Sequence, residues 1–117
     1  MGSAPSPAAT SCRDWRWSPA EKTTAHRAFD RAISRELDAI MREARERASR
    51  IAETSDLWEL ERWLSERRRQ MDRTFDFRYS VLPLVFATLL RDGRLSEDEL
   101  SGLAEEKLEA IRSWATC

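Results

Sequence analysis

The sequence predicts an all-α fold in which a long N-terminal helix and a second helix form a dimeric helical bundle, with a small C-terminal helical head. Neither Pro nor Gly occurs between Pro19 and Pro83, so nothing breaks a helix over more than half of the chain. Apolar residues recur at helical spacing within this stretch and after it. A polar cap followed three residues later by Glu, the pattern of a helix start, occurs at Ser18, Asp56 and Ser96.

Composition indicates one small domain with long solvated helices. The chain has 117 residues and is 35% charged, above the ~25% usual for globular domains. With 20 Lys and Arg against 21 Asp and Glu, its formal net charge is −1, which argues against a nucleic acid or an anionic membrane as partner. No stretch approaches the ~20 apolar residues of a membrane span.

Catalytic and metal-binding patterns are not found in the sequence. Cys12, Cys117 and the single His26 have no metal-ligand or redox spacing, so we expect no metal and no cofactor. Two isolated cysteines suit a reducing cytoplasm better than a disulfide scaffold. No Gly-rich phosphate loop or paired nucleophile occurs, and we expect no enzyme activity.

The chain begins with small, Pro-containing, unpatterned residues, which predict a flexible tail over residues 1–16. A single helical domain is expected over residues 17–117, with a hairpin and dimer region at 17–74 and a head at 75–117. Trp15 and Trp17 allow two interpretations. They anchor the tail on the folded part, or they belong to a partner-binding segment beside Arg16.

The first helix begins at Ser18 and Pro19, with Glu21 completing a capping box, and is expected to reach about Glu53. Such a helix is about 50 Å long at 1.5 Å per residue, more than one small chain can cover. A row of apolar residues at heptad spacing lies along it, and we expect this row to form a homodimer interface. The row consists of Ile33, Leu37, Ile40, Ala44 and Ile51.

The second helix is expected to begin with Asp56 as its cap and to end near Thr74. Its apolar side, predicted to be buried, carries Leu57, Leu60, Leu64, Met71 and Phe75, with Trp63 and Arg67 at the margin. Trp58 points the opposite way, among charged residues. Two interpretations are open. Trp58 either has no binding role, because it packs on another helix of the fold or is one of the scattered apolar residues of any surface, or it is a hot spot for a partner protein. The polar residues of its face are Glu61, Arg62, Ser65 and Arg69, with Arg68 at the edge.

The C-terminal third predicts a compact helical head. Residues 81–90 are apolar almost all round, as in a buried helix, with Ser80 as the expected cap and Pro83 in the first turn. Gly93 supplies the stop. Ser96 and Glu99 open a short helix ending near Gly102, and Leu103, Leu108, Ile111 and Trp114 give a last amphipathic helix. Asp92 to Glu99 also has EF-hand offsets, but Leu90 falls on a ligand position, so no calcium site is expected.

Two long segments, DLWELERWLSERR and MDRTFDFRYSVLPLVFATLLRDGRLSEDELSGL, stand out together with a shorter one, WSPAE. From Trp17 to about Ile111 they resemble, the last of them weakly, the fluorescence recovery proteins, which act on the orange carotenoid protein of cyanobacteria. The resemblance implies an all-α dimer with a long first helix and a helical head. It also implies binding to the light-activated carotenoid protein, a faster return to the orange state, and an end to phycobilisome quenching without covalent chemistry. In an organism with phycobilisomes the expected location is the cytoplasm, peripheral to the thylakoid surface.

The resemblance also implies a partner-binding patch on the helix that begins at DLW. The family's Trp matches Trp58 and its Arg matches Arg68, with Glu61 beside them, whereas Arg62 stands where family members carry an acidic residue. Facing an unchanged partner, that reversal leaves like charges opposite each other. The alternative hypothesis is a helical dimer of this family that serves as an adaptor or structural module for a different partner.

Overall fold

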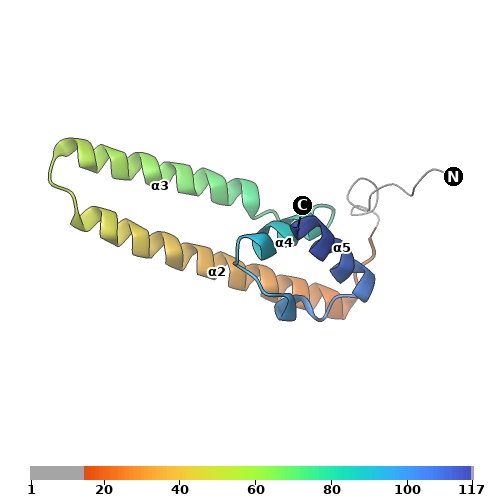
Figure 1. Cartoon of the computed structure of the whole chain (residues 1–117). Helices are drawn as coiled ribbons and strands as arrows, with labels where there is room; N and C mark the ends of the chain where they lie inside the picture. Colours follow the sequence, from red (N-terminus) through yellow and green to blue (C-terminus); the bar gives the residue numbers. More distant parts are fainter. Residues whose placement is uncertain (1–14, 117) are drawn as a thin grey trace.

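The computed structural model describes residues 15–116, which contain helices and no strand (Figure 1). The elements are α2 (Pro19–Ser49), α3 (Thr54–Thr74), α4 (Leu82–Arg91), the 3₁₀ helix η2 (Glu97–Leu100) and α5 (Glu105–Ala115). Helices α2 and α3 run side by side as a hairpin, and the other three gather on the N-terminal half of α2 as the head (Figure 1). The predicted all-α class is confirmed. Most of the expected flexible tail, residues 1–14, lies outside the described residues, as does Cys117.

The start of α2 matches its sequence signal. The Ser18 hydroxyl accepts from the Glu21 N–H at 3.1 Å, and the Glu21 carboxylate accepts from the Ser18 N–H at 3.0 Å. This capping box, with Pro19 in the first turn, fixes where the longest helix of the described chain begins.

The link between α2 and α3 differs from the prediction. Helix α2 ends at Ser49 instead of about Glu53, because the Asp56 carboxylate accepts from the backbone N–H groups of Ala52 and Glu53, each at 3.0 Å. Those two bonds turn the chain and start α3 at Thr54. The expected role of Asp56 as the cap residue is therefore wrong. Glu53 is the cap, and Asp56 is the third residue of the helix.

The core lies in the head, where α4 and α5 pack on a small-residue face of α2. Ala25, Ala28 and Ala32 are buried there, in one apolar cluster with residues of α4, η2 and α5. The larger buried residues are Phe29, Leu82, Phe86, Leu89, Leu95, Leu100, Leu103 and Ile111. At ~1.5 to 3 kcal/mol for each large apolar side chain, this cluster is the main source of stability within one chain.

Helix α4 begins one residue later than expected. Val81 is its cap instead of Ser80, because a turn before it already uses the Arg78 carbonyl, which accepts from the N–H groups of Val81 and Leu82. Pro83 lies in the first turn as predicted. Gly93 ends the helix with a φ of 76°, and the next N–H donates back to the Leu89 carbonyl at 2.9 Å.

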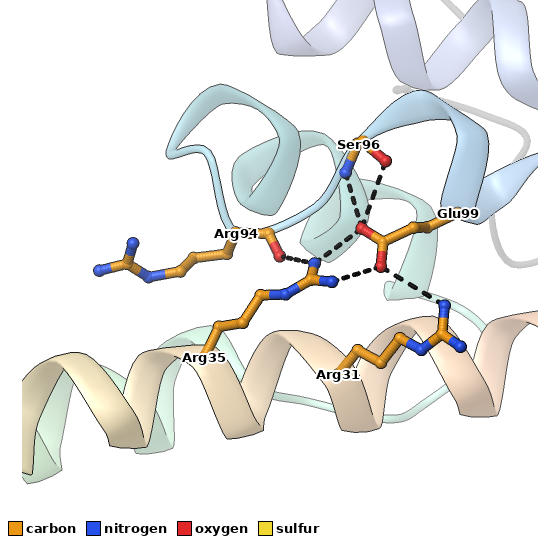
Figure 2. Close-up of polar contacts among 5 residues, drawn as sticks. All are labelled: Arg31, Arg35, Arg94, Ser96 and Glu99. Carbon is orange, nitrogen blue, oxygen red and sulfur yellow. Dashed lines mark hydrogen bonds and ion pairs between the residues drawn. The ribbon is translucent and has the colours of Figure 1, made fainter.

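An ion-pair cluster holds η2 against α2 (Figure 2). Both terminal nitrogens of Arg35 donate to the two Glu99 oxygens at 2.7 Å, and Arg35 also donates to the Arg94 carbonyl at 2.9 Å. Arg31 lies 3.6 Å from the same carboxylate. In the predicted capping box, the Glu99 carboxylate also accepts from the Ser96 N–H at 3.0 Å. The Arg35 guanidinium is the main reason that the pKa of Glu99 falls to about 2.

A second tie joins the start of α2 to α5 in the head. Lys107 donates to Glu21 at 2.8 Å and to the Arg16 carbonyl, and a second Glu21 oxygen accepts from the Ala104 N–H at 2.9 Å. Burial alone would raise the pKa of Glu21, but hydrogen bonds from Lys107, Ser18 and Ala104 outweigh it and lower the pKa to about 2.

Trp15 and Trp17 anchor the chain beside this pair. The Lys107 ammonium lies 4.7 Å from the centre of the Trp17 ring, and the rings of Tyr79 and Trp15 lie 5.1 Å and 6.4 Å from the same ring. Trp15 stacks on Trp114 of α5, with the ring centres 5.9 Å apart. The anchoring interpretation is therefore confirmed, and packed structure begins by Trp15, inside the range expected for the tail.

Candidate partner-binding site

Trp58 is the most accessible of the exposed large apolar side chains in the described part of the chain. It lies in the second turn of α3, and 56% of its surface remains exposed. The chain's own helices therefore do not cover it, in contrast to the interpretation that it packs within the fold. Because Asp56 fixes the first turn of α3, it also sets the direction in which Trp58 projects two residues later. Hydrogen bonds from the backbone N–H groups of Ala52 and Glu53 lower the pKa of Asp56, so this carboxylate is ionised at neutral pH.

On the helix α3, Arg62 lies one turn after Trp58 and Arg68 lies ten residues after it. Glu66 accepts from Arg69 at 3.3 Å and lies 3.8 Å from Arg73. Arg62 and Arg68 are exposed, and within the described residues neither forms an ion pair.

The remaining predicted contact residue, Glu61, forms a hydrogen bond with a neighbour on the same helix. Its carboxylate accepts from the Ser65 hydroxyl one turn further along α3, at 3.1 Å. The outer face of α3 thus combines a large aromatic ring, two free guanidinium groups and one accessible carboxylate. Such a mixture can bind another protein, since Trp and Arg are the residues most enriched in interface hot spots.

Only part of the predicted dimer row lies on α2 and is free of contact with the head. Leu37 is 43% exposed and Ile40 and Ala44 are half-buried, all three on α2. Ile33 is half-buried and packs against the head core. Ile51 lies beyond the last residue of α2, so the helical spacing expected for it is wrong.

Sequence reasoning missed how much apolar surface the hairpin leaves open. The predicted buried side of α3 is only partly covered within one chain, because Leu57 is 45% and Leu64 is 39% exposed, whereas Phe75 packs against the head core. Instead, Trp63 contacts α2, with the Arg47 guanidinium 4.6 Å from the centre of its ring. Met41, at the margin of the predicted row on α2, is also exposed. An exposed apolar surface of this kind is typical of an interface between subunits.

Other kinds of site find no support in residues 15–116. No three His, Cys, Asp or Glu side chains there gather closely enough to hold a metal ion. Within the same range, no helix combines the length and the apolar content that a membrane span requires.

Comparison with known proteins gives a consistent result. A family model described as "Photoprotection regulator fluorescence recovery protein" matches residues 17–115. The fluorescence recovery protein of Synechocystis is 40% identical over 99 residues, covering 85% of this chain and 91% of the relative. The chain belongs to the fluorescence recovery protein family. It is thus a regulator of photoprotection by family membership.

Solved structures of fluorescence recovery proteins share the whole fold. The protein from Fremyella diplosiphon is 41% identical and superposes with a TM-score of 0.84, covering 87% of this chain and all of that one. The Synechocystis protein is 39% identical with the same TM-score and coverage. The matched range includes the hairpin, the head and Trp58, so the expected family fold is confirmed over the described elements.

Proposed function

We propose that this chain binds light-activated orange carotenoid protein and accelerates its return to the inactive orange state, which ends photoprotective quenching at the phycobilisome. The observation that carries the proposal is the exposed Trp58, which lies on α3 with Arg62 and Arg68, two exposed arginines that form no ion pair within the described residues, in a chain of the fluorescence recovery protein family. Trp58, Glu61, Arg62 and Arg68 are the proposed contact residues.

Such a regulator works through binding energy alone. A protein that binds one state of a two-state partner, or the barrier between the states, more tightly than the other shifts populations or rates by that difference. Each 1.4 kcal/mol of preference for the barrier is worth about a tenfold change in rate. A central aromatic anchor typically contributes ~2 kcal/mol or more, so Trp58 can account for about a 30-fold effect by itself.

We further propose that the working form is a homodimer through the hairpin region, residues 17–74. Leu37, Ile40 and Ala44 of the predicted row would be joined by Met41 and by Leu57 and Leu64 of α3. With each large apolar side chain worth ~1.5 to 3 kcal/mol when buried, covering four of them favours association by several kcal/mol before entropy costs. A dimer would carry two copies of the Trp58 site.

The proposed location follows from the proposed partner. Phycobilisomes attach to the thylakoid surface, so the chain would act in the cytoplasm, peripheral to that membrane.

The test is co-elution on a size-exclusion column with orange carotenoid protein encoded in the same genome. The illuminated carotenoid protein should elute with this chain as a larger complex, and the protein kept in the dark should form less of it. Equal absence of a complex in both states would contradict the proposal and favour an adaptor dimer with a different partner.

A further inference from the structure

We propose that Arg62 pairs with a carboxylate of the partner, so that the surface receiving Trp58 carries an Asp or Glu about one helical turn from the indole pocket. This inference rests on the proposed function, since it specifies the chemistry of the partner at the same site.

The geometry places Arg62 beside Trp58. The two residues are four apart on the continuous helix α3, so their Cβ atoms lie about 5 to 6 Å from each other on one face. Both side chains are exposed, and a surface that covers the indole must also meet the guanidinium.

Carboxylates of the same helix do not neutralise Arg62. Glu66, four residues after Arg62, pairs with Arg69 and Arg73 instead. Glu59, three residues before Arg62, lines a hollow with Arg47 and Arg50 and therefore faces α2. Arg62 thus keeps its donors available in the described part of the chain.

Water satisfies the donors of the exposed Arg62 guanidinium in the free chain. On binding, the cost of removing that water depends on the chemistry of the partner surface. Binding that excludes water around Trp58 also desolvates the neighbouring guanidinium, which is costly unless a new acceptor replaces the water. A cationic surface adds repulsion, and an apolar surface leaves the donors without partners. A carboxylate satisfies both needs, because it can accept two parallel N–H bonds from Arg.

The composition of the chain makes a direct chemical test possible. Only two of its 20 Lys and Arg residues are lysines, Lys22 and Lys107, and Lys107 is buried against Glu21. The variant Arg62→Lys introduces a primary amine on the outer face of α3. A zero-length carbodiimide reagent joins an amine only to a carboxylate in contact with it, and mass spectrometry of the product identifies both residues.

The matched control is Arg27→Lys, which introduces the same amine at an exposed position of α2 that has no ion pair among the described residues. The probe is light-activated orange carotenoid protein encoded in the same genome. We expect a cross-link between position 62 and an Asp or Glu of the probe, and none from position 27. Arg62→Gln should weaken binding about tenfold at low salt, and much less at high salt because exposed ion pairs are screened.

The other outcomes separate the two proposals. If the complex forms but position 62 gives no cross-link to the probe, or Arg62→Gln binds as tightly as the wild type, the pairing is overturned and the proposed function stands. If no variant forms a complex with the probe, both are overturned.

Discussion

The tie between Glu21 and Lys107 gives the strongest stability prediction. In Glu21→Gln the side chain keeps its size but loses its charge. Lys107, only 10% of whose side chain is exposed, then loses its counter-ion beside Trp15 and Trp17. The amide also cannot accept from Ser18, Lys107 and Ala104 together with the strength of the carboxylate.

Two independent estimates of the cost agree. Removing one member of a buried ion pair typically costs ~3 to 5 kcal/mol. The fall in the pKa of Glu21 from 4.5 to about 2 corresponds to about 3 kcal/mol of folding free energy, at ~1.4 kcal/mol per unit. For a chain of this length a loss of that size lowers Tm by roughly 10 to 15 °C.

The assay is thermal unfolding followed by far-UV circular dichroism, with Glu46→Gln as the control. Glu46 also lies on α2 and pairs with Arg50 at 3.1 Å, but both side chains are exposed, so its loss should cost less than about 1 kcal/mol. The reasoning is refuted if the two variants melt within 3 °C or so of each other, because a several-fold larger ΔΔG must separate them further.

The pH dependence gives a separate check on the same residue. The pKa of Glu21 is lower in the folded than in the unfolded protein, so its contribution is fully present above about pH 4.5 and is lost as pH falls toward 2. The wild type should therefore lose more stability across that window than Glu21→Gln. Both lose the contribution of Glu99, whose pKa is also about 2.

Three further changes test other parts of the account. Leu37→Glu places a charge in the exposed apolar surface of α2. Light scattering should show that the mass falls from twice 13.6 kDa toward that of the monomer. A wild type that is monomeric at micromolar concentration would contradict the proposed dimer. Glu99→Gln removes the charge that pairs with Arg35. It should lower the free energy of unfolding, measured in urea, by about 2 kcal/mol. Gly102→Ala puts a Cβ 2.0 Å from the Thr24 hydroxyl and should destabilise the head, with partial recovery when combined with Thr24→Ala; an unchanged midpoint would mean that the loop can move aside.

Local chemistry predicted most of the fold. Ser18 with Glu21, Gly93, and Ser96 with Glu99 each act within a few residues of the chain, and each is found where the sequence indicates. The error at Asp56 has the same local origin. An acidic residue followed three positions later by Glu fits a cap, but an acidic residue three positions after Glu53 fits the closing member of another capping box equally well.

Interactions between distant segments could not be predicted in this way. Arg35 and Glu99 lie 64 residues apart, and Glu21 and Lys107 lie 86 apart, so no periodicity pairs them. The same holds for α3. The spacing of its residues identified one apolar side, but it could not show that much of this side stays exposed within one chain. The direction of Trp58, opposite to the apolar side of α3, follows from its position on the helix, but its exposure does not, because the sequence left open that it packs on another helix of the fold.

The most direct test of the central claim is the dark recovery of the orange absorption spectrum after illumination of the carotenoid protein. The wild type should accelerate recovery, and Trp58→Ala at equal dimer concentration should lose most of the acceleration, about 30-fold for ~2 kcal/mol. Since Trp58 is 56% exposed, circular dichroism should show that this variant remains folded. Recovery that is equally fast with Trp58→Ala, or that the wild type does not change, would contradict the account.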